Sequence, residues 1–474
     1  MLLVFAGAQA YGQYELDALR FSRPYATGTA RFVGMGGAFG AIGGDITTIS
    51  HNPAGLGLFR NSSITVSPSL FFTHSGTGYE GAEFNDSKFN FNFGNVGLVY
   101  SRRFNKTKTK GLQFLNFAIA YNRVNNFNRS YFFEGDDSLN SIGTYMQTNA
   151  QGLTPSALNP FQELLAFNSY LIDTAGGPTS YFTNGPFPGE TKRMLNRTDS
   201  KGSAGEIALA GAINLGNKFF IGANISVGIL NYKNTYTYSE TDVTGSIPVF
   251  DNLTYRENLD VSGVGVSLKV GAIYRPLNWL RVGLAIHSPT WYNMSEDYFN
   301  ELNTSFTFGK FSTNSAVGHF EYDLATPWKL QASAAFVILK NAVIGVDYEL
   351  IDYSSINLRS SSGSFTSANA FIDSAYAVSH NVKIGAEYRI DPFRIRAGYQ
   401  FQMNPFVSSL GPDATAHHIS VGAGYHSKRW FSADIAYMIS LTNGSDSMFR
   451  GFDLPQAQIN IINHSLVITG AVNF

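Results

Sequence analysis

Residues 34–45 read Gly-Met-Gly-Gly-Ala-Phe-Gly-Ala-Ile-Gly-Gly-Asp, and residues 52–56 read Asn-Pro-Ala-Gly-Leu. Glycine adopts positive φ at little cost and lets one backbone segment lie close to another, so these stretches favour a compact, loop-rich segment over a regular helix or strand. We predict such a segment over residues 14–60. Since it is short and glycine-rich, it needs a larger structure to pack into.

The rest of the chain, residues 61–474, repeats segments in which apolar and polar residues alternate. Alternation with a period of two predicts strands. Fourteen are expected, an even number as in bacterial single-chain barrels: 62–74, 89–104, 112–132, 204–215, 218–238, 254–275, 278–288, 316–338, 342–358, 378–390, 393–402, 416–427, 429–440 and 464–474. The sequence predicts an all-β fold, a transmembrane antiparallel β-barrel of about 14 strands with residues 14–60 as an N-terminal hatch, or plug, in the lumen.

The expected connections alternate between tight turns, such as 216–217 and 391–392, and longer stretches. These longer stretches are 75–88, 133–203, 239–253, 289–315, 359–377, 403–415 and 441–463. Outer-membrane barrels have short periplasmic turns and long extracellular loops. The pattern therefore predicts a multi-pass protein of the bacterial outer membrane with both termini on the periplasmic side, and 133–203 as the longest extracellular loop.

Alternation alone is also compatible with a soluble sandwich or a ligand-filled barrel. The chain contains 39 Phe and 25 Tyr, and it has no apolar run of the ~18 residues that a membrane helix requires. Tyrosines recur near the ends of the apolar faces, where an apolar ring with a wet hydroxyl suits a membrane interface: Tyr274, Tyr348, Tyr388, Tyr425 and Tyr437. These features favour a wall that faces lipid.

Several classes of function are disfavoured by composition and motif content. A net charge of -1 with 14% charged residues provides no basic field for nucleic acid. The chain has no cysteine for disulfides or thiolate metal sites, and neither His-Glu-x-x-His nor Gly-x-Ser-x-Gly occurs. His417 and His418 are adjacent, so on a strand they face opposite sides. We expect no enzyme activity, no metal and no cofactor.

The first ten residues, Met-Leu-Leu-Val-Phe-Ala-Gly-Ala-Gln-Ala, form an apolar run that ends in a small-x-small pattern. This pattern is typical of a signal-peptidase site, so residues 1–13 are predicted to be the remnant of a signal peptide. The alternative is a short buried strand.

The last predicted strand places Leu466, Ile468, Val472 and Phe474 on one face. A terminal aromatic residue with this alternation resembles the assembly signal of outer-membrane barrels, which implies the barrel-assembly machinery as a partner. A closing strand that pairs with the first strand is the simpler interpretation, and both can hold.

Taken together, the apolar leader, Ala18-Leu-Arg-Phe-Ser22, the 34–45 run, Asn52-Pro-Ala-Gly-Leu56 and the fourteen strands resemble the OmpP1/FadL/TodX family. The family consists of outer-membrane transporters of long-chain fatty acids and aromatic hydrocarbons. The resemblance implies a hydrophobic small-molecule substrate that is captured by extracellular loops, passes to a lumenal pocket at the hatch, and leaves sideways into outer-membrane lipid. It assigns the hatch and gating role to the motif and the glycine-rich run before it: Asn52, Pro53, Ala54, Gly55, Gly36, Gly37 and Asp45.

Two further groups of residues are candidates for ligand contact. Phe161, Leu164 and Leu165 share one face of a predicted helix, and Trp291 and Tyr292 lie in another predicted loop. These side chains either capture ligand or pack onto the barrel mouth. In the lumen, Lys383, Arg394 and Arg396 either pair with acidic residues or meet a substrate carboxylate.

Two functions follow from the sequence. The first is passive transport of hydrophobic small molecules, because each methylene gains about 0.8 kcal/mol on burial and an apolar path lowers the barrier to passage. The second is an outer-membrane barrel that serves as a binding or scaffold component for a protein partner such as a secretion machine, since a fold does not fix a function. An apolar path from the loops to the hatch would favour the first.

Overall fold

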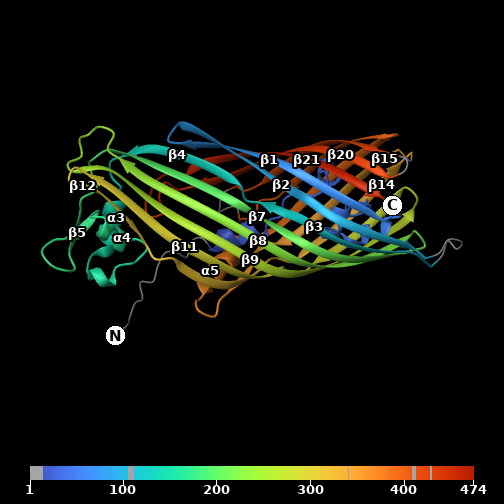
Figure 1. Ribbon diagram of the computed structural model, residues 1–474, viewed down its shortest axis with the longest axis horizontal. Coiled ribbons are helices and arrows are strands. Elements are labelled where there is room, and N and C mark those ends of the chain that lie inside the picture. Colours follow the sequence, from blue (N-terminus) through green and yellow to red (C-terminus); the bar gives the residue numbers. More distant parts are fainter. Residues whose placement is uncertain (1–13, 105–110, 340, 408–412, 428–429) are drawn as a thin grey trace.

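The computed structural model describes residues 14–104, 111–339, 341–407, 413–427 and 430–474, and it forms one closed antiparallel β-barrel (Figure 1). Fourteen strands cross the wall, and some of them are interrupted. The first strand pairs with the last from Ser63↔Asn473 to Gly78↔Gln458, which closes the barrel. The predicted fold class is therefore confirmed.

The wall strands alternate in direction. They are β1 (Ser63–Tyr79), β2 (Ala82–Arg103), β3 (Leu112–Asn126) continued by β4 (Arg129–Asp137), β7 (Lys192–Leu215), β8 (Phe219–Thr241), β9 (Phe250–Leu277), β10 (Leu280–His287) continued by β11 (Trp291–Phe306), β12 (Gly309–Asn314) with β13 (Gly318–Ala325) and β14 (Lys329–Ile338), β15 (Ala342–Asp352) continued by β16 (Asn357–Arg359), β17 (Val378–Ile390), β18 (Phe393–Gln402), β19 (Ala416–His426), β20 (Phe431–Asp446) and β21 (Ala457–Asn473).

One end of the barrel, here called the short-turn rim, carries connections such as 216–218 and 391–392. The other end, the long-loop rim, carries α3 (Ile142–Ala150), η3 (Pro155–Ala157), α4 (Glu163–Asn168), β5 (Ile172–Thr174), β6 (Tyr181–Thr183), η4 (Tyr353–Ser355) and α5 (Thr366–Ala375). No helix among the described residues is long and apolar enough to cross a membrane.

The strands reach further towards the long-loop rim than predicted. β1 and β2 continue to a tight turn at Glu80 and Gly81, so the expected loop 75–88 is wrong. The expected loop 289–315 is also wrong, because β11 and β12 occupy most of it, and 133–203 loses its two ends to β4 and β7. Beyond the apolar band the outward side chains are polar, so the alternation on which the prediction relied is absent there.

The two faces of the wall have opposite character. Outward side chains such as Ile395, Ile419 and Val421 are more than half exposed, whereas inward ones such as Gln400 and Ser420 are buried. The five tyrosines expected at the interfaces all lie on the outer face and are exposed. A wall that is apolar outside and polar inside is what a lipid-facing barrel requires.

The lumen holds the N-terminal segment, drawn in dark blue inside the wall in Figure 1. Its elements are α1 (Tyr14–Ser22), α2 (Ala30–Gly34), η1 (Ile46–Ser50) and η2 (Pro53–Leu58). We call this segment the plug. Its first described residue, Tyr14, packs against Tyr322 and Phe365 in the half of the lumen nearer the long-loop rim. The predicted signal peptide, residues 1–13, and the position of the N-terminus lie outside the described residues.

Phe474 lies at the short-turn rim, where its backbone N–H and C=O form hydrogen bonds of 2.9 and 3.2 Å with Ser62.

Candidate functional site

The Asn-Pro-Ala motif joins two parts of the plug. Asn52 is 1% exposed, its Oδ1 accepts a hydrogen bond from the Ala54 N–H at 3.1 Å, and its Nδ2 donates to the Gly40 carbonyl at 2.7 Å. Pro53 occupies the first turn of η2, where its missing N–H costs nothing. The Gly55 carbonyl accepts from Gly44 N–H at 3.1 Å. The motif is therefore an N-cap that also ties η2 to the glycine-rich run.

The glycine-rich run depends on glycine where φ is positive. Gly36 and Gly37 have φ of 60° and 74°, a region that side chains disfavour. A β-carbon on Gly36 would also lie 2.8 Å from the Tyr399 backbone nitrogen. Asp45 accepts hydrogen bonds from Thr29 Oγ1 at 2.7 Å and from Thr47 N–H at 2.9 Å. In the structure these predicted gating residues hold the plug in shape.

The wall meets the plug through glycines of its own. Seven inward-facing glycines on β8, β9, β10, β15, β17, β18 and β19 lie so close to the plug that an added β-carbon would meet plug atoms within 3.3 Å, most of them backbone. We call them the glycine belt: Gly222, Gly271, Gly283, Gly345, Gly385, Gly398 and Gly422. A β-carbon on Gly345, for example, would lie 2.5 Å from the Ala38 carbonyl oxygen.

Three of these glycines, Gly345, Gly385 and Gly398, are direct cross-strand neighbours. Plug and wall thus pack backbone against backbone over half of the circumference. The sequence did not predict the glycine belt, because a glycine on the polar face of a strand gives no sign that another backbone segment packs against it.

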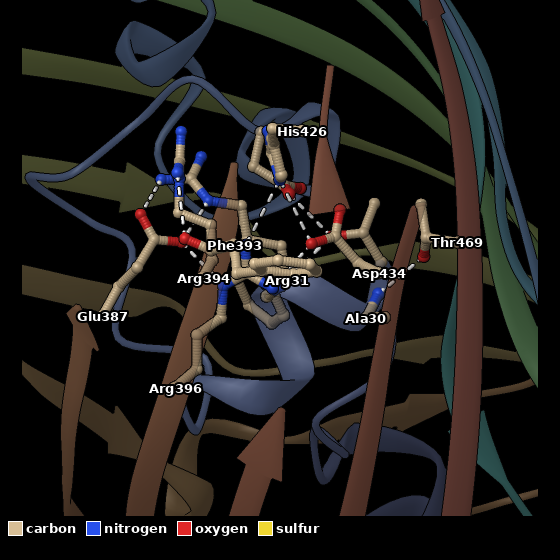
Figure 2. Close-up of polar contacts among 12 residues, drawn as sticks. Ala30, Arg31, Glu387, Phe393, Arg394, Arg396, His426, Asp434 and Thr469 are labelled. Carbon is tan, nitrogen blue, oxygen red and sulfur yellow. Dashed lines mark hydrogen bonds and ion pairs between the residues drawn. The ribbon is translucent and has the colours of Figure 1, made fainter. Parts of the chain in front are cut away.

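Ion pairs fix the side of the plug nearer the short-turn rim (Figure 2). Arg31 donates through Nε and Nη2 to the two carboxylate oxygens of Glu387, each at 3.0 Å. Arg396 donates to Glu387 at 2.6 Å and to Asp434 at 2.6 Å. Figure 2 shows these groups converging from α2 and three wall strands. Of the two hypotheses for Arg396, the geometry favours a structural network.

The other two predicted lumen cations also have acidic partners. The Lys383 ammonium lies 3.3 Å from Glu349, which also lies 3.7 Å from the Lys329 ammonium. Arg394 lies at the short-turn rim and donates to Asp391 at 2.9 Å. Hydrogen bonds from Arg389 and Arg394 lower the pKa of the Asp391 carboxyl to about 2. Each cation is therefore matched by a carboxylate.

A cavity of about 360 Å³ lies between the plug and the long-loop rim. Its apolar lining comes from α1 and from the wall, including Leu19, Phe127, Tyr232 and Leu259. Charged groups, among them Arg20, Arg129, Asp446 and Arg450, line the same space. More than half of the lining residues are polar or charged, so the cavity suits a ligand with both an apolar and a polar part better than a purely apolar one. No signal in the sequence pointed to this set, because its members come from the plug and from six or more strands.

The mouth above this cavity is closed by packed loops. Leu165 is 1% exposed, Leu164 packs on the same cluster, and the Phe161 ring lies 5.0 Å from Tyr298. Phe449, from the loop before β21, packs on Tyr145 and Tyr238 within the cluster. Three of the predicted capture residues thus pack onto the mouth.

The other two predicted capture residues lie on β11. Trp291 is 52% exposed on the outer face, and Tyr292 points inward and is 6% exposed. Neither lies in a loop at the mouth, so the structure does not bring these five residues together.

The wall is interrupted beside the cavity. β2 pairs with β3 only from Arg103↔Phe114 to Asn95↔Asn122. Beyond that point β2 pairs with β1 and β4 pairs with β7, and the described residues show no backbone pairing between β2 and β4. Phe127 and Asn128 separate β3 from β4, and both line the cavity.

Side chains bridge this interruption. Ser130 on β4 donates to Asp86 on β2 at 2.8 Å, and Arg197 on β7 donates to the same carboxylate at 3.1 Å. Lys88 on β2 donates to Asp199 on β7 at 2.6 Å. Exposed or half-exposed polar contacts of this kind are weak compared with a continuous backbone ladder. We call this site the β2–β4 gap.

The sequence of the barrel matches that of a known protein family. Residues 204–451, a little over half of the chain, match the sequence model described as outer membrane protein transport protein (OMPP1/FadL/TodX). The match lies within the barrel and does not include the plug motif. No curated protein matches the sequence.

Solved structures of the same architecture cover nearly the whole chain. The Pseudomonas putida toluene transporter TodX has a TM-score of 0.55 and 12% identity over 95% of this chain and 99% of its own. The Ralstonia pickettii toluene transporter TbuX gives 0.53 and 14%, with the same coverage. A FadL homologue from Pseudomonas aeruginosa gives 0.54 and 12%, again over 95% and 99%. At such identities the likeness establishes the fold.

Proposed function

The chain belongs to the OMPP1/FadL/TodX family of outer membrane transport proteins, and from this premise we propose that it carries hydrophobic small molecules passively across the outer leaflet by lateral release through the β2–β4 gap. The family and its structural neighbours are transport channels rather than enzymes, as the sequence predicted. The observation that carries the proposal is that the cavity above the plug reaches the wall at Phe127 and Asn128, beyond Asn122, the last residue of β3 that pairs with β2.

In this proposal the long-loop rim faces outside and the short-turn rim faces the periplasm. The short-turn end of β21 then lies on the periplasmic side, where the barrel-assembly machinery would contact this strand. The packed loops around Phe449 close the entrance, so a hydrophobe enters when these buried aromatic side chains move apart.

The second step is transfer into the cavity. An acyl chain gains about 0.8 kcal/mol for each methylene removed from water, so Leu19, Phe127 and Leu259 favour its entry without an energy source. The charged groups in the same lining suit a substrate with a polar end. Fatty acids and similar amphiphiles fit this mixed surface.

The third step is lateral exit. A route through the plug would require breaking the glycine belt and the Arg31–Glu387 ion pair, whereas the β2–β4 gap is held by side chains alone. Opening the gap exchanges hydrogen bonds such as Ser130–Asp86 for contacts with lipid headgroups and water. In this proposal the gap, which is also spanned by the aromatic contacts Tyr79–Phe133 and Phe84–Phe132, costs less to open than the plug costs to displace.

A disulfide across the gap tests the route. The chain has no cysteine, so Asp86→Cys with Ser130→Cys introduces a single pair at the site of the 2.8 Å side-chain contact. We expect oxidation to stop uptake of a fluorescent long-chain fatty acid into proteoliposomes, and reduction to restore it. Ligand retained by the purified barrel, measured by mass spectrometry of organic extracts, should be unchanged.

A matched control is Thr241→Cys with Asn252→Cys, which joins residues already paired between β8 and β9 and away from the cavity lining. Its oxidation should leave uptake intact. Equal uptake by the oxidised and reduced gap variants would exclude the lateral route. A barrel that neither retains nor takes up hydrophobes would instead favour a role as a docking platform for a protein partner.

A further inference from the structure

Three tyrosine–histidine pairs recur on the outer face of the wall. Each joins a tyrosine hydroxyl to the Nδ1 of a histidine on the next strand: Tyr348 with His380 at 2.6 Å, Tyr399 with His417 at 2.9 Å, and Tyr437 with His464 at 2.6 Å. All three pairs are exposed at the surface of the barrel. We call them the Tyr–His pairs.

Their geometry is the same each time. Tyr348, Tyr399 and Tyr437 stand directly opposite Val382, Ile419 and Leu466, and the histidine lies two residues from that partner towards the long-loop rim. The three tyrosines have almost equal exposure, at 39%, 38% and 39%. Because the same diagonal contact recurs on β15–β17, β18–β19 and β20–β21, it is a regular feature of the wall and not an isolated contact.

The pairs also lie at one height. His380, His417 and His464 precede the last residues of β17, β19 and β21 (Ile390, His426 and Asn473) by ten, nine and nine residues. At a rise of about 3.3 Å per residue and a strand tilt of about 40°, this distance corresponds to roughly 25 Å along the barrel axis. An apolar band of about 25 Å is what outer-membrane barrels present to lipid.

The outward residues between the histidines and the short-turn rim have the uncharged character expected of an apolar band of about 25 Å. On β17 they are Val382, Ile384, Ala386, Tyr388 and Ile390, and on β19 they are Ile419, Val421, Ala423 and Tyr425. None of these outward side chains is charged. The histidines therefore mark the edge of the hydrocarbon region on the long-loop side.

At that edge each histidine has one nitrogen left for a partner. With the tyrosine hydroxyl donating to Nδ1, the neutral imidazole carries its proton on Nε2. Within the described ranges, the Nε2 atoms of His380, His417 and His464 make no hydrogen bond to protein. Each pair thus presents a fixed N–H donor at the level where lipid headgroups begin.

We propose that the Tyr–His pairs bind the phosphate groups of lipids in the leaflet on the long-loop side. A phosphate oxygen is the strongest acceptor at that level, and a donor whose ring is already held by a tyrosine loses little freedom on binding. The three sites lie on β15–β21, on the far side of β1 from the β2–β4 gap. They would hold the barrel at a fixed depth while the gap opens.

Native mass spectrometry of the full-length barrel tests this inference with two lipids that share their acyl chains. Phosphatidylglycerol carries a phosphate, and digalactosyl diacylglycerol does not. We expect the wild-type protein to retain more phosphatidylglycerol, and the triple variant His380→Phe, His417→Phe, His464→Phe to lose up to three copies per barrel. Phenylalanine suits a lipid-facing position, so the variant should still fold.

Two variants separate the pairs from general lipid contact. Tyr388→Phe with Tyr425→Phe alters exposed outer-face tyrosines near the short-turn rim and should leave the lipid count unchanged. His319→Phe removes an exposed histidine that lies beside Asp297 and Glu321, carboxylates that disfavour a phosphate, and should also leave it unchanged. Equal retention of the two lipids by wild type, or an unaltered count in the triple variant, would overturn the inference. Neither result would bear on transport through the gap.

Discussion

The Asn52 side chain occupies the space that a β-carbon on Gly271 would need. Gly271→Ala should therefore force either the motif or β9 to move, at a cost of about 1–3 kcal/mol, as for other overpacked sites. We expect a lower midpoint for heat-induced loss of the folded form on SDS gels. Gly470→Ala, at a strand glycine with no atom within 4 Å of the added carbon, is the matched control. Equal midpoints for Gly271→Ala and Gly470→Ala would show that Asn52 or β9 moves aside without a measurable loss of stability.

Glu387 neutralises the buried Arg396 and the half-buried Arg31, so Glu387→Gln should loosen the plug. Arg31 and Arg396 would lose their shared carboxylate, and breaking a buried ion pair costs about 3–5 kcal/mol. We expect larger and more frequent current steps in planar bilayers, because the plug no longer seals the lumen.

Arg389→Gln, which removes an exposed partner of Asp391, provides the comparison and should change conductance little. A Glu387→Gln barrel with wild-type conductance would mean that the glycine belt alone holds the plug.

Leu259→Trp should fill the cavity above the plug. Leu259 lines this cavity, and the larger indole takes up space that a ligand would use. We expect at least a tenfold weaker binding of a fluorescent fatty acid with no loss of thermal stability. Leu209→Trp, at an outward and 54% exposed position, should leave binding unchanged. Normal binding by Leu259→Trp would place the ligand elsewhere.

Phe449→Ala should open the mouth. Phe449 is 5% exposed and packs edge-on against Tyr145 and at a tilt against Tyr238, so its truncation removes about 3–5 kcal/mol of local packing. We expect faster proteolysis within 447–456 and faster uptake of hydrophobes at low concentration. Leu139→Ala alters a 69% exposed residue on the same rim and should change neither rate. Slower uptake by Phe449→Ala would indicate that the aromatic cluster captures ligand instead of blocking it.

Much of the fold follows from the sequence because a period of two is visible wherever one face meets lipid. Ile395, Ile419 and Val421 were placed on the outer face by this pattern, and the structure agrees. Past the apolar band the pattern ends while the backbone ladder continues, so Trp291 was expected in a loop although it lies on β11.

The candidate site was less predictable because it is made by contacts across the lumen. Asn52 was identified by a local motif, yet its partner Gly40 and the glycine belt depend on how the plug sits in the wall. The β2–β4 gap arises from an interruption at Phe127 and Asn128 that contains neither glycine nor proline. The lumen charges were partly predictable. The polar face of its strand placed Lys383 inward, but the sequence pattern could not show which carboxylate would lie beside it.

The glycine belt also bears on how the barrel assembles. A wall strand that paired one residue out of register would turn its glycine towards lipid and drive a side chain such as Ile384 or Ala397 into the plug. Only the correct pairing lets seven strands close around the same backbone surface. Packing against the plug therefore favours the native register of each of these strands over a register shifted by one residue.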